Sequence, residues 1–126
     1  MDALREARSI RDGLGRGLDQ EMVRPIAAMI CLGVQTTQSC SGHPDHGTSF
    51  PWIDIEASLK QRKMLALKLP SFHPVKRGSS SFPDNYRIQP REIATIDSPD
   101  PGGSWPGQLQ ELQEFSERVL FHCKDE

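Results

Sequence analysis

The pattern that most constrains the fold lies near the C-terminal end of the chain, over about residues 106–123. Apolar residues recur there at a helical spacing, at Leu109, Leu112, Phe115, Val119, Leu120 and Cys123. Three glutamates and an arginine occupy the opposite positions, so the segment predicts an amphipathic helix with one buried face. That face needs an apolar partner, which we expect to be a sheet built from the middle of the chain.

Three further segments have helical character, over about residues 2–12, 20–32 and 59–69. Asp19 is a favourable N-cap for the second segment, and Gly33 predicts a Schellman ending in the left-handed conformation. Pro25 indicates that this helix is kinked there or begins there. Ser58 can cap the third segment, although the alternating leucines of that segment also fit a strand.

Four short segments have strand character, over residues 34–39, 50–56, 86–89 and 93–96. Residues 70–85 are rich in Ser, Pro and Gly and predict an exposed loop, and residues 98–107 predict a linker containing Trp105. The order of elements predicts a single α+β domain over residues 1–126, with a sheet of about four strands and helices packed on it.

Composition excludes several classes of protein. The chain has three cysteines, an odd number that argues against a disulfide framework and favours a reducing, cytoplasmic location. No apolar run approaches the roughly 18–20 residues that a bilayer span requires, so we expect no membrane partner. The first six residues have mixed charge, which is not typical of a secretory signal.

Charge is segregated along the chain. Residues 57–91 carry eight basic residues and one acidic residue, whereas residues 92–126 carry two basic and eight acidic residues. The basic segment can attract phosphates of a ligand or nucleic acid, or it can face the acidic segment within the fold. Both readings stay open at this point.

The richest chemistry lies between residues 36 and 46, after a predicted strand. The segment carries hydroxyls, a thiol, amide groups and two imidazoles, and its glycine permits close backbone approach. Hydroxyls and backbone amides in such a turn can bind an anion, and an arginine of the basic segment can add charge. The predicted ligand-binding residues are Thr37, Ser39, Cys40, Ser41, Gly42, His43 and Arg87.

The same segment supports two other chemistries. Cys40, His43 and His46 offer a thiolate and two imidazoles, which suit zinc, although the spacing matches no standard zinc pattern. Cys40 can also act as a nucleophile if His43 or His46 serves as its base.

A family resemblance rests on Gly17-Leu18-Asp19, the helix that follows, and the run Thr36-Thr37-Gln38-Ser39-Cys40-Ser41-Gly42. These features resemble the start of the tRNA wybutosine-synthesising methyltransferase family, with its Thr-Thr-Ser-Ser-Cys-Ser-Gly-Arg signature. The resemblance implies S-adenosylmethionine as cofactor, a modified guanosine in tRNA as substrate, and a site lined by Ser39, Cys40, Ser41 and Gly42. His43 stands where the family has arginine. The chain is more similar to a loose group of uncharacterised small bacterial and phage proteins with Ser-Cys-x-Gly-His after a helix.

Three functions follow from these observations. The leading hypothesis is a domain that binds a small anionic ligand or nucleic acid at residues 36–46. The first alternative is a zinc-binding module or a zinc-dependent enzyme that uses Cys40, His43 and His46. The second alternative is a protein-interaction domain, such as a homodimer, in which the cluster only packs.

Overall fold

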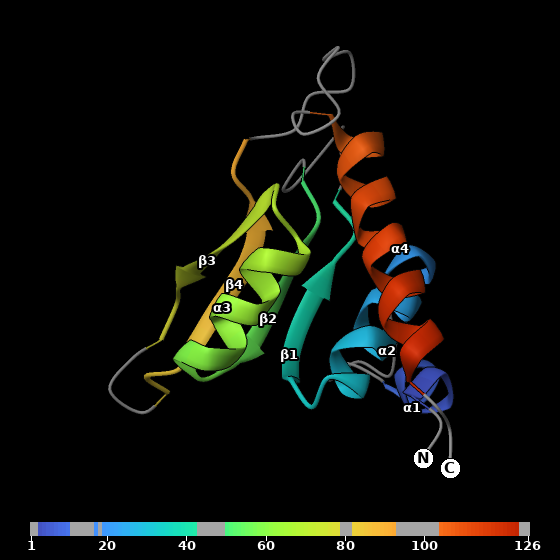
Figure 1. Ribbon diagram of the computed structural model, residues 1–126, viewed down its shortest axis with the longest axis horizontal. Coiled ribbons are helices and arrows are strands. Elements are labelled where there is room, and N and C mark those ends of the chain that lie inside the picture. The colour runs from blue at the N-terminus through green and yellow to red at the C-terminus, as the bar shows by residue number, and fades with distance from the viewer. Residues whose placement is uncertain are drawn as a thin grey trace.

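A computed structural model of the chain describes residues 3–10, 17, 19–42, 50–78, 82–92 and 104–123. Within these ranges the chain forms, in order, α1 (Ala3–Ser9), a 3-10 turn η1 (Gln20–Met22), α2 (Val23–Cys31), β1 (Gln35–Cys40), β2 (Trp52–Glu56), α3 (Leu59–Lys68), β3 (Phe72–Lys76), β4 (Asn85–Pro90) and α4 (Trp105–His122) (Figure 1). The predicted α+β class is confirmed. None of these helices combines the length and the apolarity that a membrane crossing needs.

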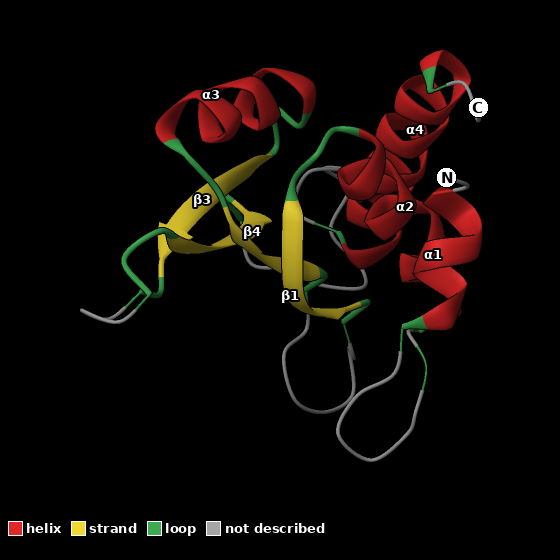
Figure 2. Cartoon of the chain, turned by 90° about the horizontal axis from the view of Figure 1, so that it is seen from below, coloured by secondary structure: helices red, strands yellow, loops and turns green. Residues whose placement is uncertain are grey.

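The four strands form one antiparallel sheet in the order β1-β2-β4-β3. Helix α3 lies over the β3 and β4 side of the sheet, and α2 and α4 pack together beside β1 (Figure 2). The helices and one face of the sheet share a single core of buried side chains, which includes Ile53, Ile55, Leu65, Ile88, Leu112 and Phe115. That core accounts for the apolar stripe that predicted α4.

Local capping signals set the helix boundaries. Gly33 has φ +75°, and the backbone N–H groups of Gly33 and Val34 donate to the carbonyls of Ile30 and Met29, which is the predicted Schellman ending of α2. Ser58 caps α3 in a complete capping box, since its hydroxyl accepts from the backbone N–H of Gln61 while the Gln61 side chain accepts from the backbone N–H of Ser58.

Two predictions about helix N-termini need correction. Asp19 occupies the predicted N-cap position, before η1, but its side chain makes no capping hydrogen bond, because its carboxylate accepts from Ser41 instead. Trp105 is the first residue of α4, not part of a linker, because the Ser104 hydroxyl caps that helix by accepting from the backbone N–H of Gly107. Pro25 lies in the first turn of α2, where a missing N–H costs no helical hydrogen bond.

The loop predicted over residues 70–85 is also wrong in part, because Phe72–Lys76 form strand β3. The strand contains Pro74, which cannot donate to a ladder and is tolerated because β3 is an outer strand of the sheet. Phe72 is buried in the core, whereas the other residues of the strand are half-buried or exposed. The strand predicted over residues 93–96 lies outside the described residues.

The cysteines also differ from expectation. Cys31 at the end of α2 and Cys123 just after α4 form a disulfide, with their Cα atoms 6.0 Å apart. The odd number of cysteines argued against a disulfide framework, yet two of the three cysteines pair with each other, and Cys40 is a free thiol. The two helices that pair here are far apart in sequence, so no local pattern indicates their contact.

Candidate ligand-binding site

Ser41, which directly follows β1, is held by residues from two distant segments. Asp19 accepts hydrogen bonds from both the backbone N–H and the hydroxyl of Ser41, at 3.1 and 3.0 Å. The indole Nε1 of Trp105 donates to the carbonyl of Ser41 at 2.8 Å. All three polar groups of the buried Ser41 thus have partners within the protein, so the residue is tied to Asp19 and Trp105.

Gly42 allows the chain to pass close to Phe50 and Trp105. Its φ of +92° is a left-handed conformation, and a Cβ atom at this position would come within 2.8 Å of the carbonyl carbon of Phe50 and 2.9 Å of the Trp105 Nε1. The backbone N–H of Gly42 donates to the sulfur of Cys40 at 3.4 Å. The predicted role of this glycine in close backbone approach therefore has a structural counterpart, although the neighbour is protein.

The predicted residues of β1 are divided between the two faces of the sheet. Directly opposite residues of an antiparallel pair share a face. Ser39 is opposite Ile53, on the face that packs against the helices, whereas Cys40 is opposite Trp52 on the other face. The period of two along the strand separates neighbours that appeared as one cluster in the sequence. We call the second face the polar face, defined by Cys40, Trp52, Asp54, Arg87 and Gln89.

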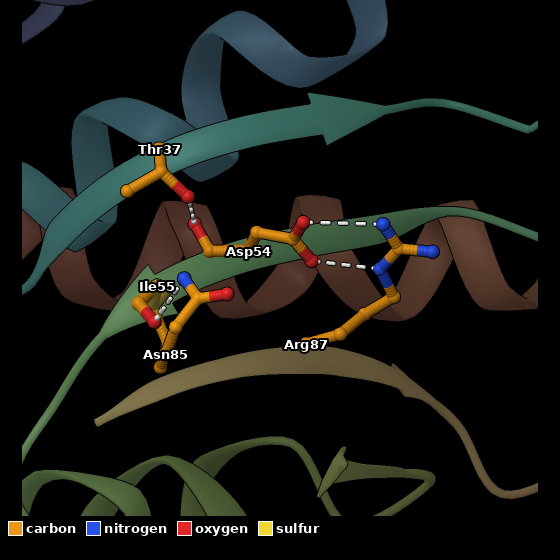
Figure 3. Close-up of polar contacts among 5 residues, drawn as sticks. All are labelled: Thr37, Asp54, Ile55, Asn85 and Arg87. Atoms are coloured by element: carbon orange, nitrogen blue, oxygen red, sulfur yellow. Dashed lines mark hydrogen bonds and ion pairs between the residues drawn. The ribbon is translucent and has the colours of Figure 1, made fainter. Parts of the chain in front are cut away.

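An arginine and an aspartate form the centre of the polar face. Nε and Nη2 of Arg87 donate to the two carboxylate oxygens of Asp54 at 2.7 and 3.1 Å (Figure 3). The guanidinium carbon of Arg87 also lies 3.7 Å from the centre of the Trp52 ring. The side chains of Arg87 and Asp54 are 13% and 9% exposed, so solvent screens this pair weakly. These contacts fix the orientation of the guanidinium group.

The third guanidinium nitrogen, Nη1, has no hydrogen bond to any described residue. It points away from Asp54, along the strands in the direction of the C-terminal end of β1 (Figure 3). Cys40 ends β1 on this side and is directly opposite Trp52, whose ring lies against the Arg87 guanidinium. Cys40 and Arg87, two residues predicted for the site, therefore lie on the two strands that border β2.

Two further polar residues lie at this end of the polar face. Gln89 is two residues beyond Arg87 on the same face of β4, and His73 on β3 is directly opposite Gln89. Both are half-buried. We did not expect His73 here because its segment was predicted to be a loop. A short strand containing proline and flanked by glycine and serine gives little sequence signal.

A pocket of about 270 Å³ lies at the other end of the polar face. It is lined by Thr37, Glu56, Arg77, Gly78, Phe82 and Asn85. An irregularity in the β1 register leaves Thr37 without a directly opposite residue, and its hydroxyl donates to the Asp54 carbonyl at 3.4 Å (Figure 3). The pocket contains both a cation and a carboxylate, so its charge alone does not select an anion.

The predicted zinc ligands are only partly described. Cys40 is half-buried at the end of β1, whereas His43 and His46 lie outside the described residues. Within the described ranges no three His, Cys, Asp or Glu side chains gather closely enough to hold a metal ion. The zinc site stays a prediction.

Sequence reasoning missed Asp19, Trp52, Asp54 and Trp105 as residues that shape the site. Residues 50–56 were predicted to form a strand, in which Trp52 and Asp54 lie on the same face because they are two positions apart. This spacing is the signal that could have identified them. The contacts of Asp19 and Trp105 join residues 22 and 64 positions apart and have no local signature.

The chain has no significant match among models of known protein families, among curated proteins or among solved structures. The resemblance to the methyltransferase family, and the S-adenosylmethionine that it implies, stay predictions. Conclusions on function rest on the geometry of the polar face.

Proposed function

We propose that the protein binds a small anionic ligand on the polar face, beside Cys40, with Nη1 of Arg87 as the anchor. The observation that carries the proposal is the fixed orientation of Arg87 by Asp54 and the Trp52 ring, with Nη1 pointing toward the Cys40 end. A guanidinium group that is held before the ligand arrives loses little side-chain entropy on binding.

The neighbouring residues supply the remaining chemistry. Gln89 and His73 carry donors on the two strands beyond Trp52, at the end toward which Nη1 points. Guanidinium, amide and imidazole N–H groups all donate hydrogen bonds, and carboxylate and phosphate oxygens can accept from the three together. Because the Asp54 carboxylate offsets the charge of Arg87, we expect selection by hydrogen-bond geometry more than by net charge.

The full chain is titrated with inorganic phosphate, short carboxylates and nucleoside monophosphates, and binding is measured by calorimetry and by thermal shift. Arg87→Lys keeps the charge but loses the planar edge, and it should weaken binding about tenfold or more. Arg77→Gln is the matched control, because Arg77 lines the pocket at the opposite end of the same face. Retained affinity in that variant supports the Arg87 anchor, whereas its loss would place the ligand in the other pocket.

Asp54→Asn provides a second expectation. Removal of the carboxylate frees the Arg87 guanidinium to change orientation, so affinity for the anion should fall together with the stability of the folded state. If no small anion binds saturably to any form, the proposal is wrong. If an oligonucleotide alone binds, with affinity that falls steeply with salt, the surface is assigned to nucleic acid instead.

A further inference from the structure

A second pocket, of about 500 Å³, lies where the C-terminal ends of α2, α3 and α4 meet. Its lining includes Cys31, Lys68, Phe115, Arg118, Val119 and His122. The buried side chains of Phe115 and Val119 supply an apolar floor. This pocket is separate from the polar face, because its lining residues belong to the helices and their ends, whereas the polar face is formed by strand residues.

The disulfide forms part of the wall of this pocket. Cys31 lines it and is bonded to Cys123, which follows the last residue of α4. The sulfur of Cys31 lies 4.0 Å from the carbonyl oxygen of Val119, another lining residue. Both cysteines are half-buried, so the bond is not sealed within the core. The pocket is therefore lined by one of the two residues that form the disulfide.

The polar lining of the pocket is basic. Lys68, Arg118 and His122 line it, and none of the described lining residues is acidic. Nη2 of Arg118 donates to the carbonyl of Lys68 at 3.3 Å, which holds the guanidinium at the end of α3. Part of this positive charge compensates the helix C-termini that meet here. The remainder is available to an anion within reach of the disulfide.

We propose that this pocket binds a small anionic thiol, which exchanges with the Cys31–Cys123 disulfide. The proposal does not depend on ligand binding at Arg87. Cationic side chains beside a disulfide favour an incoming thiolate and stabilise the thiolate that leaves. A carboxylate on the thiol supplies the charge that Lys68 and Arg118 can bind.

The exchange has two balanced steps. The thiolate of the small molecule attacks the sulfur of Cys31, the bond to Cys123 breaks, and Cys123 leaves with the electron pair as a thiolate. A second thiolate then attacks the small-molecule sulfur of the mixed disulfide and releases Cys31 as a thiolate. The two protons lost by the two thiols end on the two cysteines, and the products are the dithiol protein and a small-molecule disulfide.

The test measures reduction of the full chain by three thiols that differ in charge: 3-mercaptopropionate, 2-mercaptoethanol and cysteamine. Each rate is divided by the rate of the same thiol with an uncharged reference disulfide, which removes differences in intrinsic reactivity. Alkylation and mass spectrometry follow the reaction, because the count of free thiols rises from one to three. The anionic thiol should exceed the cationic one by roughly tenfold at low salt, and the ratio should approach one at high salt.

The double variant Lys68→Gln/Arg118→Gln should lose most of this charge preference. Lys63→Gln is the matched control, since Lys63 is an exposed cation on α3 that does not line the pocket. Equal normalised rates for the three thiols, or a preference that survives in the double variant, would overturn the proposal. If the double variant does not fold, the salt dependence of the unmodified chain decides alone. A mixed disulfide trapped on Cys123 instead of Cys31 would contradict the direction of attack.

Discussion

Gly42→Ala tests whether the close approach of the chain after β1 to Phe50 contributes to stability. An alanine in the left-handed conformation costs about 1–2 kcal/mol. The added Cβ would also meet the Phe50 carbonyl carbon at 2.8 Å, and backbone yields less readily than the end of a side chain. Such overpacking costs about 1–3 kcal/mol. We therefore expect the free energy of unfolding to fall by roughly 2–5 kcal/mol.

Gly33→Ala is the matched control. Gly33 also has a positive φ, of +75°, but apart from the adjoining chain no atom lies within 4 Å of the position that a Cβ atom would occupy there. The free energy of unfolding of Gly33→Ala should therefore fall only by the conformational cost of about 1–2 kcal/mol. Urea denaturation of both variants measures the difference, provided that the m-values agree. Equal losses in the two variants would refute the close approach of Gly42 to Phe50.

Three other predictions concern stability and metal content. The disulfide joins residues 92 positions apart, and the loop-entropy model predicts that such a bond stabilises the folded state by roughly 4–5 kcal/mol. A reductant should therefore lower Tm by roughly 10–20 °C, and an unchanged Tm would contradict the bond. Ser58→Ala should cost about 1 kcal/mol in urea denaturation, because α3 loses its capping box, and a neutral result would mean that the cap does not form. If Cys40, His43 and His46 hold a structural zinc ion, a chelator should lower Tm, and Cys40→Ser should lower it without a chelator. The site would be contradicted if the purified protein contains well under one equivalent of metal and added zinc causes no thermal shift.

Local patterns predicted much of the fold. The stripe of α4, the glycine that ends α2 and the serine that caps α3 each act over one or two turns of chain, so they can be read from sequence. Strand β3 could not be predicted in this way. Its residues pair with β4 only once the sheet has formed, and a proline within a segment argues against a strand until its outer position is known.

Only part of the candidate site could be predicted, again because some of its contacts depend on strand pairing. The segment around Cys40 is identifiable because its polar residues are consecutive, but the face that each side chain occupies depends on register with β2. The contact of Arg87 with Trp52 and Asp54 joins two strands separated by α3 and β3 in sequence. Such pairings are set by tertiary packing, which local propensity does not encode.

The two outer strands of the sheet affect how this protein can associate with other chains. β1 contains the register irregularity near Thr37, and β3 contains Pro74, which has no N–H to donate. Both outer strands of the described sheet are therefore poor templates for an added strand. We therefore expect a second copy of the chain, or an extended peptide, to associate through side-chain surfaces. We also expect the same irregularities to disfavour edge-to-edge aggregation at high protein concentration.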